Sequence, residues 1–239
     1  IIYVFKNDNF EGKEGIRNLS FSINNICKNI KKSNYSDKIK ITLVEECKSL
    51  KQQLVSSKLF IEEENLEYIN HLLVTNEKNQ DFNSCKCFNY AFKNIKSEFS
   101  LWLVGRIFFN DLSFFNLLKL IEDSKKSHLY DHDRSLYTIN RFFIKKDIEN
   151  RNDYNFLNNY LNNLEIYPKP NSFYPGLVSG FGALLCKTQI LVKENGFDES
   201  FWSGMNDIEL GYRFSEKYEI ISLLSKNIYC FDVNKVQNR

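Results

Sequence analysis

The chain has 239 residues, of which 43% are apolar and 15% aromatic, a composition typical of a globular protein with an aromatic-rich core. Its 32 basic and 30 acidic residues leave a net charge of +2, which gives no electrostatic case for nucleic acid as a partner. No apolar run approaches the roughly 18 residues of a membrane span. We expect a cytoplasmic domain. Because the chain begins at Ile1, we also expect a longer protein, whose other parts could attach it to a membrane.

The six cysteines form no CxxC pair and no metal-binding framework. They are Cys27, Cys47, Cys85, Cys87, Cys186 and Cys230. We expect reduced and mostly buried thiols, which suits the cytoplasm.

Strands and helices alternate over the first 125 residues. Runs of β-branched and aromatic residues predict strands at 1–5, 38–44, 71–75 and 99–104. Apolar spacings of three and four predict helices at 16–30, between the second and third strands, around 91–95 and at 112–121. This order predicts an α/β fold, in which a mostly parallel sheet carries helices on both faces.

The second half of the chain is less regular. A polar segment at 150–163 has the spacing of a surface helix, and three prolines at 168, 170 and 175 mark a loop. We expect further strands at 137–144, 182–186, 218–224 and 228–233, and helices beginning near Thr188 and Asp207.

Three charged residues follow predicted strands. Glu45 and Glu46 end the second strand, and Arg106 follows the fourth. Ligands of parallel α/β sheets bind where the strands end, so topology places these side chains in or near a cleft. Either glutamate could instead be a solvated helix cap, and the residues alone leave that choice open.

The stretch from Gly196 to Arg213 holds the densest group of candidate site residues. Phe201 and Trp202 precede a predicted helix whose start contains Asn206, Asp207 and Glu209. A carboxylate fixed at a helix start beside an aromatic shelf can present a base to a sugar hydroxyl. The alternative is a capped helix that packs on an aromatic core.

This stretch resembles a known C-terminal motif. Gly-Phe-Asp-Glu-x-Phe-Trp followed by Asn-Asp-Ile-Glu-Leu-Gly-Tyr-Arg is similar to the galactosyltransferase-type motif of nucleotide-sugar glycosyltransferases with the GT-A fold, and the chain looks like their family 2. Weaker matches come in the right order at Ile1–Phe5 with Arg17–Leu19, at Phe82–Asn89 and at Ser100–Leu103.

The resemblance implies one Rossmann-like GT-A domain over 1–239. Its mostly parallel sheet would have a nucleotide-sugar-binding half at 1–125 and a smaller acceptor-binding half at 126–239. Asp207 would be the general base, taking the proton of the acceptor hydroxyl. The acceptor would also meet Trp202, Asn206 and Glu209, with Asn206 standing where the family has an acid. The donor would meet Glu45, Glu46, Asn89 and Arg106.

The resemblance fails at the metal site. The family's Asp-x-Asp should fall at Val104-Gly105-Arg106, and its late histidine near Tyr229–Asp232, and neither is there. We therefore assign no metal ligand, since Mg²⁺ or Mn²⁺ would lack the carboxylates it needs. Arg106 could take the place of the metal beside the diphosphate.

Two further acidic stretches have simpler interpretations. Asp131-His132-Asp133 reads like Asp-x-Asp but comes one helix too late, so we expect a polar turn with a surface histidine. Asn110-Asp111 is expected to cap the helix at 112–121.

The leading functional hypothesis is transfer of a sugar from a nucleotide diphosphate, most simply a UDP-sugar, to a glycan acceptor in polysaccharide biosynthesis. This transfer would be metal-independent. The alternative is a catalytically inactive GT-A-like module for glycan binding or for pairing with another domain. A third reading, an unrelated nucleotide-binding α/β protein, has no GxGxxG or Walker loop to support it.

Overall fold

The computed structural model of the chain describes residues 1–6, 12–47, 59–76, 82–103, 105, 107–127, 131–143, 159, 183–201, 206–223 and 227–232. The predicted helix at 150–163, except Asn159, and the predicted proline loop lie outside these residues. No helix in this part of the chain is both long and apolar enough to cross a membrane.

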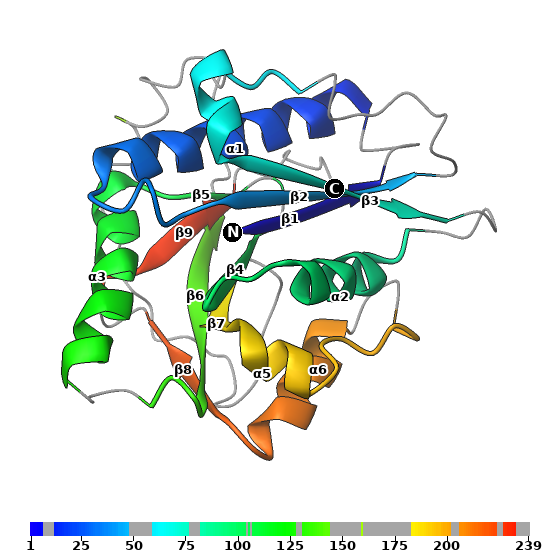
Figure 1. Cartoon of the computed structure of the whole chain (residues 1–239), viewed down its shortest axis with the longest axis vertical. Helices are drawn as coiled ribbons and strands as arrows, with labels where there is room; N and C mark the ends of the chain where they lie inside the picture. The colour runs from blue at the N-terminus through cyan, green and yellow to red at the C-terminus, as the bar shows by residue number, and fades with distance from the viewer. Residues whose placement is uncertain are drawn as a thin grey trace.

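A central mixed sheet organises the molecule (Figure 1). Its strand order is β3-β2-β1-β4-β7-β6-β9-β5, and β8 pairs with β6. The strands are β1 Ile2–Lys6, β2 Ile41–Cys47, β3 Ile69–Thr75, β4 Phe99–Leu103, β5 Ile107–Phe108, β6 Ser135–Phe143, β7 Ala183–Lys187, β8 Glu219–Ser222 and β9 Tyr229–Asp232. The helices are α1 Gly12–Lys32, α2 Ser84–Asn94, α3 Asp111–Ser127, α5 Thr188–Lys193 and α6 Asn206–Ser215, with a 3₁₀ helix, η2, at Glu63–Tyr68.

The predicted α/β fold is confirmed. β1 pairs in parallel with β2 and β4, and β2 pairs in parallel with β3. β7 runs antiparallel to both β4 and β6, and β5 runs antiparallel to β9. The two-residue β5 was not predicted, because so short a segment has no periodicity to detect. Where a helix was expected before the third strand, the described residues contain η2.

Each face of the sheet carries its own apolar core. Side chains alternate between the faces of a strand, so Tyr3 packs with α1 and α3, whereas Ile2 packs with α2, α5 and α6. Figure 1 shows α1 on one side of β1 and β2 and α2 on the other. We call these sides the α1 face and the α2 face.

All six cysteines are buried and free of disulfides, as predicted. Burial raises the pKa of the Cys186 and Cys230 thiols above the ordinary value of 9.0, because a thiolate loses hydration in the core. The folded state therefore keeps these thiols protonated at a pH at which the unfolded chain ionises them. Their contribution to stability is complete below pH 9.0 and declines as the pH rises above it.

We therefore expect the free energy of unfolding to fall between pH 8 and pH 10.5, by about 1.4 kcal/mol per pH unit above 9 for each such thiol. Urea unfolding at several pH values measures this slope. Cys186→Ala is the matched variant. It should be less stable at pH 8 because of the cavity, yet lose stability less steeply at high pH. The same slope in both proteins would contradict this account.

Candidate functional site

Six strands end at one edge of the sheet. β1, β2, β3 and β4 are mutually parallel, and two successive antiparallel pairings through β7 make β6 parallel to β4. β9 is parallel to β6. We call this edge the carboxyl edge and the opposite one the amino edge. The last strand residues at the carboxyl edge are Lys6, Cys47, Thr75, Leu103, Phe143 and Asp232.

The two glutamates at the end of β2 point to opposite faces. Glu45 has no exposed surface and lies 3.0 Å from His71 Nε2, on the α1 face. Glu46 points to the α2 face, where its Oε1 accepts a hydrogen bond from the Asn83 backbone N–H at 3.4 Å. The expectation that either could be a solvated helix cap is wrong, because both are buried within β2.

Glu46 is only 2% exposed, and its Oε2 has no hydrogen-bond partner among the described residues. A buried carboxylate oxygen without a donor is costly, since neither water nor protein replaces its hydration. A ligand hydroxyl or N–H at this position would remove that cost.

The first turn of α2 connects Glu46 to the start of α6. Asn83 caps α2 with its side chain, and its backbone N–H reaches Glu46. Asn206 donates to Ser84 Oγ at 3.4 Å and to Cys85 Sγ at 3.2 Å. Asp207, the second residue of α6, is partly exposed, and its Oδ1 accepts from the Ile208 N–H. Glu46 and Asp207 are thus brought to the same side of the sheet, around one helix end.

Asn89 holds the turn that precedes α6. Its amide donates to Phe197 O at 2.9 Å and to Glu199 Oε1 at 3.0 Å, and its Oδ1 accepts from the Phe197 N–H. Gly196 has a φ of +60° there, and a Cβ on it would lie 2.1 Å from Asn89 Oδ1. Asn89 therefore anchors this loop, and its expected contact with the donor stays a prediction.

Arg213 fixes the same loop from the other end. Its guanidinium donates to Glu194 O at 3.0 Å and to Gly196 O at 2.7 Å. It also contacts both carboxylate oxygens of Glu209, at 2.6 and 3.2 Å. The carboxylate of Glu209 is therefore used within α6, and its expected role toward an acceptor stays a prediction. Arg106 and Trp202 lie outside the described residues.

An ion pair that the sequence analysis did not select lies at the carboxyl edge. Arg141 Nη1 on β6 is 3.1 Å from Asp232 Oδ2 on β9. The arginine side chain is 19% exposed and that of the aspartate is fully buried. The residues are far apart in sequence, and only the pairing of β6 with β9 brings them together.

The described residues at this edge provide no set of ligands for Mg²⁺ or Mn²⁺. A hard divalent cation requires several oxygen ligands, carboxylates above all. In the part of the chain that the structure describes, no group of three His, Cys, Asp or Glu side chains could hold a metal. Positions 104 and 106 carry valine and arginine.

The other acidic stretch is structural. Asp131–Arg134 is a turn before β6, which places it at the amino edge. Asp133 binds Lys187 and Gln189, which holds the pKa of its carboxyl below the ordinary value. The polar turn is as expected, but the prediction that His132 lies at the surface is wrong. His132 is buried, and its Nδ1 lies 2.6 Å from the Tyr137 hydroxyl oxygen.

Asn110 caps α3, as predicted, by accepting a hydrogen bond from the Ser113 N–H at 2.8 Å.

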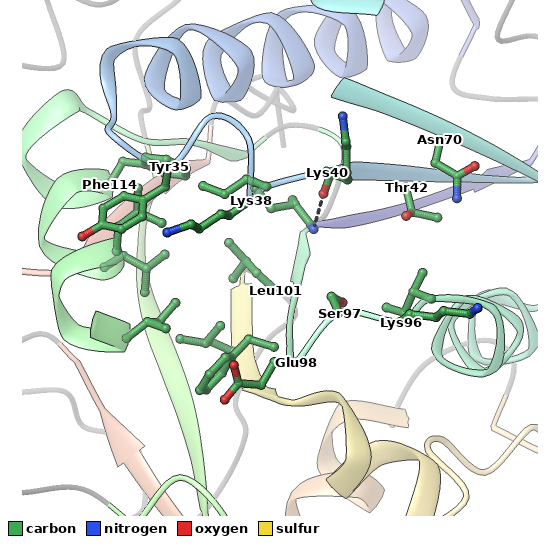
Figure 2. Close-up of a pocket in the computed structure, with 18 of the residues that line it drawn as sticks. Tyr35, Lys38, Lys40, Thr42, Asn70, Lys96, Ser97, Glu98, Leu101 and Phe114 are labelled. Carbon is green, nitrogen blue, oxygen red and sulfur yellow. Dashed lines mark hydrogen bonds between the residues drawn. The ribbon is translucent and has the colours of Figure 1, made fainter. Parts of the chain in front are cut away.

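A cavity of about 980 Å³ opens at the amino edge (Figure 2). Its mostly apolar walls include Ile69 and Phe99 at strand starts and Phe114 of α3. It lies at the opposite edge of the sheet from Glu46, so it is a separate feature from the predicted site.

Comparison with known proteins finds fold relatives only. No protein-family model and no curated protein matches the chain. S. aureus TarS 1–349 in complex with UDP matches 98% of this chain and 60% of its own, with 13% identity and a TM-score of 0.57. The match to its complex with UDP-GlcNAc covers 98% of this chain and 58% of the TarS chain, with 14% identity and a TM-score of 0.55.

The mannosyltransferase PcManGT from Pyrobaculum calidifontis, in complex with GDP-Man and Mn²⁺, matches 99% of this chain and 57% of its own, with 11% identity and a TM-score of 0.56. The chain thus spans 57% to 60% of these matched proteins. The matches show that the chain shares the fold of these proteins, in agreement with the predicted Rossmann-like α/β fold.

We expect Arg213→Gln to destabilise the fold by about 2 kcal/mol, because it leaves two loop carbonyls without a charged donor. Glu209→Gln is the control. It removes the ion pair but leaves the carbonyl contacts, and should cost only about 0.5 kcal/mol. Urea unfolding measures both. Equal losses in the two variants would show that the ion pair matters, and not the anchoring of the loop.

Proposed function

We propose that this chain is a glycosyltransferase domain. It takes a sugar from a nucleotide diphosphate donor bound at the carboxyl edge and transfers it to a glycan acceptor. The observation that carries the proposal is the arrangement around the first turn of α2, where Glu46 has a buried oxygen without a partner and the start of α6 holds Asp207. The fold relatives bound to UDP, UDP-GlcNAc and GDP-Man support a nucleotide-sugar donor.

In the proposed reaction, the acceptor hydroxyl oxygen attacks the anomeric carbon of the donor sugar. The bond from that carbon to the diphosphate oxygen breaks, and the nucleoside diphosphate leaves with the electron pair. Asp207 takes the hydroxyl proton, which strengthens the nucleophile as the new bond forms. Asn206, which donates to Ser84 and Cys85, keeps the start of α6 fixed. Trp202 and Glu209 complete the acceptor side.

On the donor side, Glu46 accepts a hydrogen bond from the nucleoside, which satisfies its buried oxygen. We assign Glu45, on the other face beside His71, and Asn89 of α2 to the same donor. Arg106 meets the diphosphate, so transfer proceeds without Mg²⁺ or Mn²⁺. We place the activity in the cytoplasm, in the assembly of a polysaccharide, within a longer protein.

One observation favours a second function. The start of α6 carries Asn206 where the family has an acid, and the family's metal acids are missing. A module that binds glycan or pairs with an active domain needs neither. Such a module would show no turnover, and its binding of acceptor would not depend on a nucleotide.

Glu46→Gln separates donor binding from stability. We expect UDP or GDP to bind about tenfold more weakly, because the carboxylate that accepts from the ligand is gone. Stability should stay the same or rise, since a neutral amide costs less to bury. Calorimetric titration and urea unfolding measure the two effects, and Glu63→Gln on exposed η2 is the control. If the unmodified protein binds no nucleotide or nucleotide-sugar, with or without Mn²⁺, the donor site is disproved.

Asp207→Asn should lower the rate of transfer by about 10²- to 10⁴-fold and leave donor affinity unchanged, because the amide cannot take a proton. Transfer from UDP-GlcNAc and GDP-Man to glycan acceptors is followed by release of the nucleoside diphosphate. Glu216→Gln, an exposed residue just after α6, is the matched control. Equal rates in Asp207→Asn and the unmodified enzyme would assign the base to another residue.

A further inference from the structure

The strand register places Arg141 at the carboxyl edge, beyond the row that holds the last residue of β4. Leu103, the last residue of β4, pairs with Ala183 of β7, and Ala183 pairs with Ile139 of β6. Leu103 and Ile139 therefore lie in one row across the sheet. Arg141 is two residues further along β6, and Gly105 is two residues further along the chain from Leu103. Arg141 thus comes from the next row outward, past the last residue of β4.

Arg141 also lies on a defined face. Leu103 and Ile139 both belong to the core of the α1 face, and a spacing of two keeps Arg141 on that face. By the same alternation Glu45, one row outward from Leu43, faces the same side. The α1 face at the carboxyl edge therefore presents a carboxylate from β2 and a cation from β6, on either side of the end of β4.

Asp232 holds this cation in place. Its carboxylate has no exposed surface, and a buried carboxylate requires a counter-charge nearby. The 3.1 Å contact with Arg141 supplies that charge. A guanidinium presents its N–H donors in a rigid fork, and the side chain of Arg141 is partly exposed at the edge. The ion pair therefore fixes a positive group that still reaches the surface of the sheet edge.

We propose that Arg141, positioned by Asp232, binds the donor diphosphate together with Arg106, in place of a divalent cation, for which the described residues provide no group of ligands. The proposal rests on the proposed function and extends it, because it assigns diphosphate recognition to a residue of β6. A diphosphate accepts two parallel N–H bonds from one guanidinium, so the geometry of the ligand matches that of the side chain.

The test compares a nucleoside diphosphate with its nucleoside. In the presence of EDTA, UDP and GDP are titrated against uridine and guanosine by calorimetry. Arg141→Gln should weaken diphosphate binding at least tenfold, the change expected for a lost charge-assisted contact, and leave nucleoside binding unchanged. Lys187→Gln, which removes an ion-paired cation at the amino edge, is the control and should change neither. Equal weakening of UDP and uridine would indicate a purely structural role and overturn the proposal.

Arg141→Gln removes the cation that is paired with the buried carboxylate of Asp232 and can unfold the protein. The double variant Arg141→Gln/Asp232→Asn replaces the pair by two neutral amides, and should fold and show the same selective loss for UDP. A second measurement uses the unmodified protein: UDP should protect Arg141 from labelling by 2,3-butanedione, read by mass spectrometry, and uridine should not. Labelling that is the same with and without UDP would contradict the proposal.

The two levels of the hypothesis fail differently. If the unmodified protein binds none of the four probes, and none of them with Mn²⁺, the proposed function fails and the role of Arg141 fails with it. If UDP or GDP binds but Arg141→Gln binds it equally well, the donor site stands and only the role of Arg141 is lost. If the unmodified protein binds UDP or GDP only in the presence of Mn²⁺, the proposal that arginine takes the place of the divalent cation is also overturned.

Discussion

Seven strands share one direction and six of them end at the same edge, which is the constraint on which the site depends. Because β1, β2, β3, β4, β6 and β9 run the same way, their ends meet at one edge, although they come from distant parts of the chain. β7 runs in the opposite direction and lies between β4 and β6 in the sheet, although it follows both of them in the sequence. Strand direction therefore brings polar residues from distant parts of the chain to one edge, and no local sequence pattern predicts that they lie near one another.

The motif residues before and within α6 act largely on one another. Asn89 and Arg213 bind the backbone of the turn at Gly196 from opposite sides, and Gly196 leaves no room for a Cβ against Asn89. Such a loop has little freedom, which fixes where α6 begins. The base that we propose at Asp207, the second residue of this helix, would then be held in place by the scaffold.

The electrostatics of the edge differ between the faces. On the α2 face, Glu46 carries a buried oxygen beside a helix start, which favours a neutral hydrogen-bond donor from a ligand. On the α1 face, Arg141 and Asp232 form an ion pair in which the aspartate is buried and the arginine is partly exposed. A donor with a nucleoside and a diphosphate has one group suited to each environment. The absence of acids at 104 and 106 is then consistent with a fixed arginine as the counter-charge.

The sequence by itself determined the α/β class, nearly every strand and helix, the cap of α3 and the buried thiols, because local periodicity and capping chemistry specify them. It also indicated the first turn of α6 and the ends of the strands. Only the tertiary structure decided that His71 aligns Glu45, that Asn89 and Arg213 anchor one loop, that His132 is buried, and that Arg141 meets Asp232. Those contacts join residues whose proximity follows from strand register or from packing between elements, and a local pattern carries no information about either.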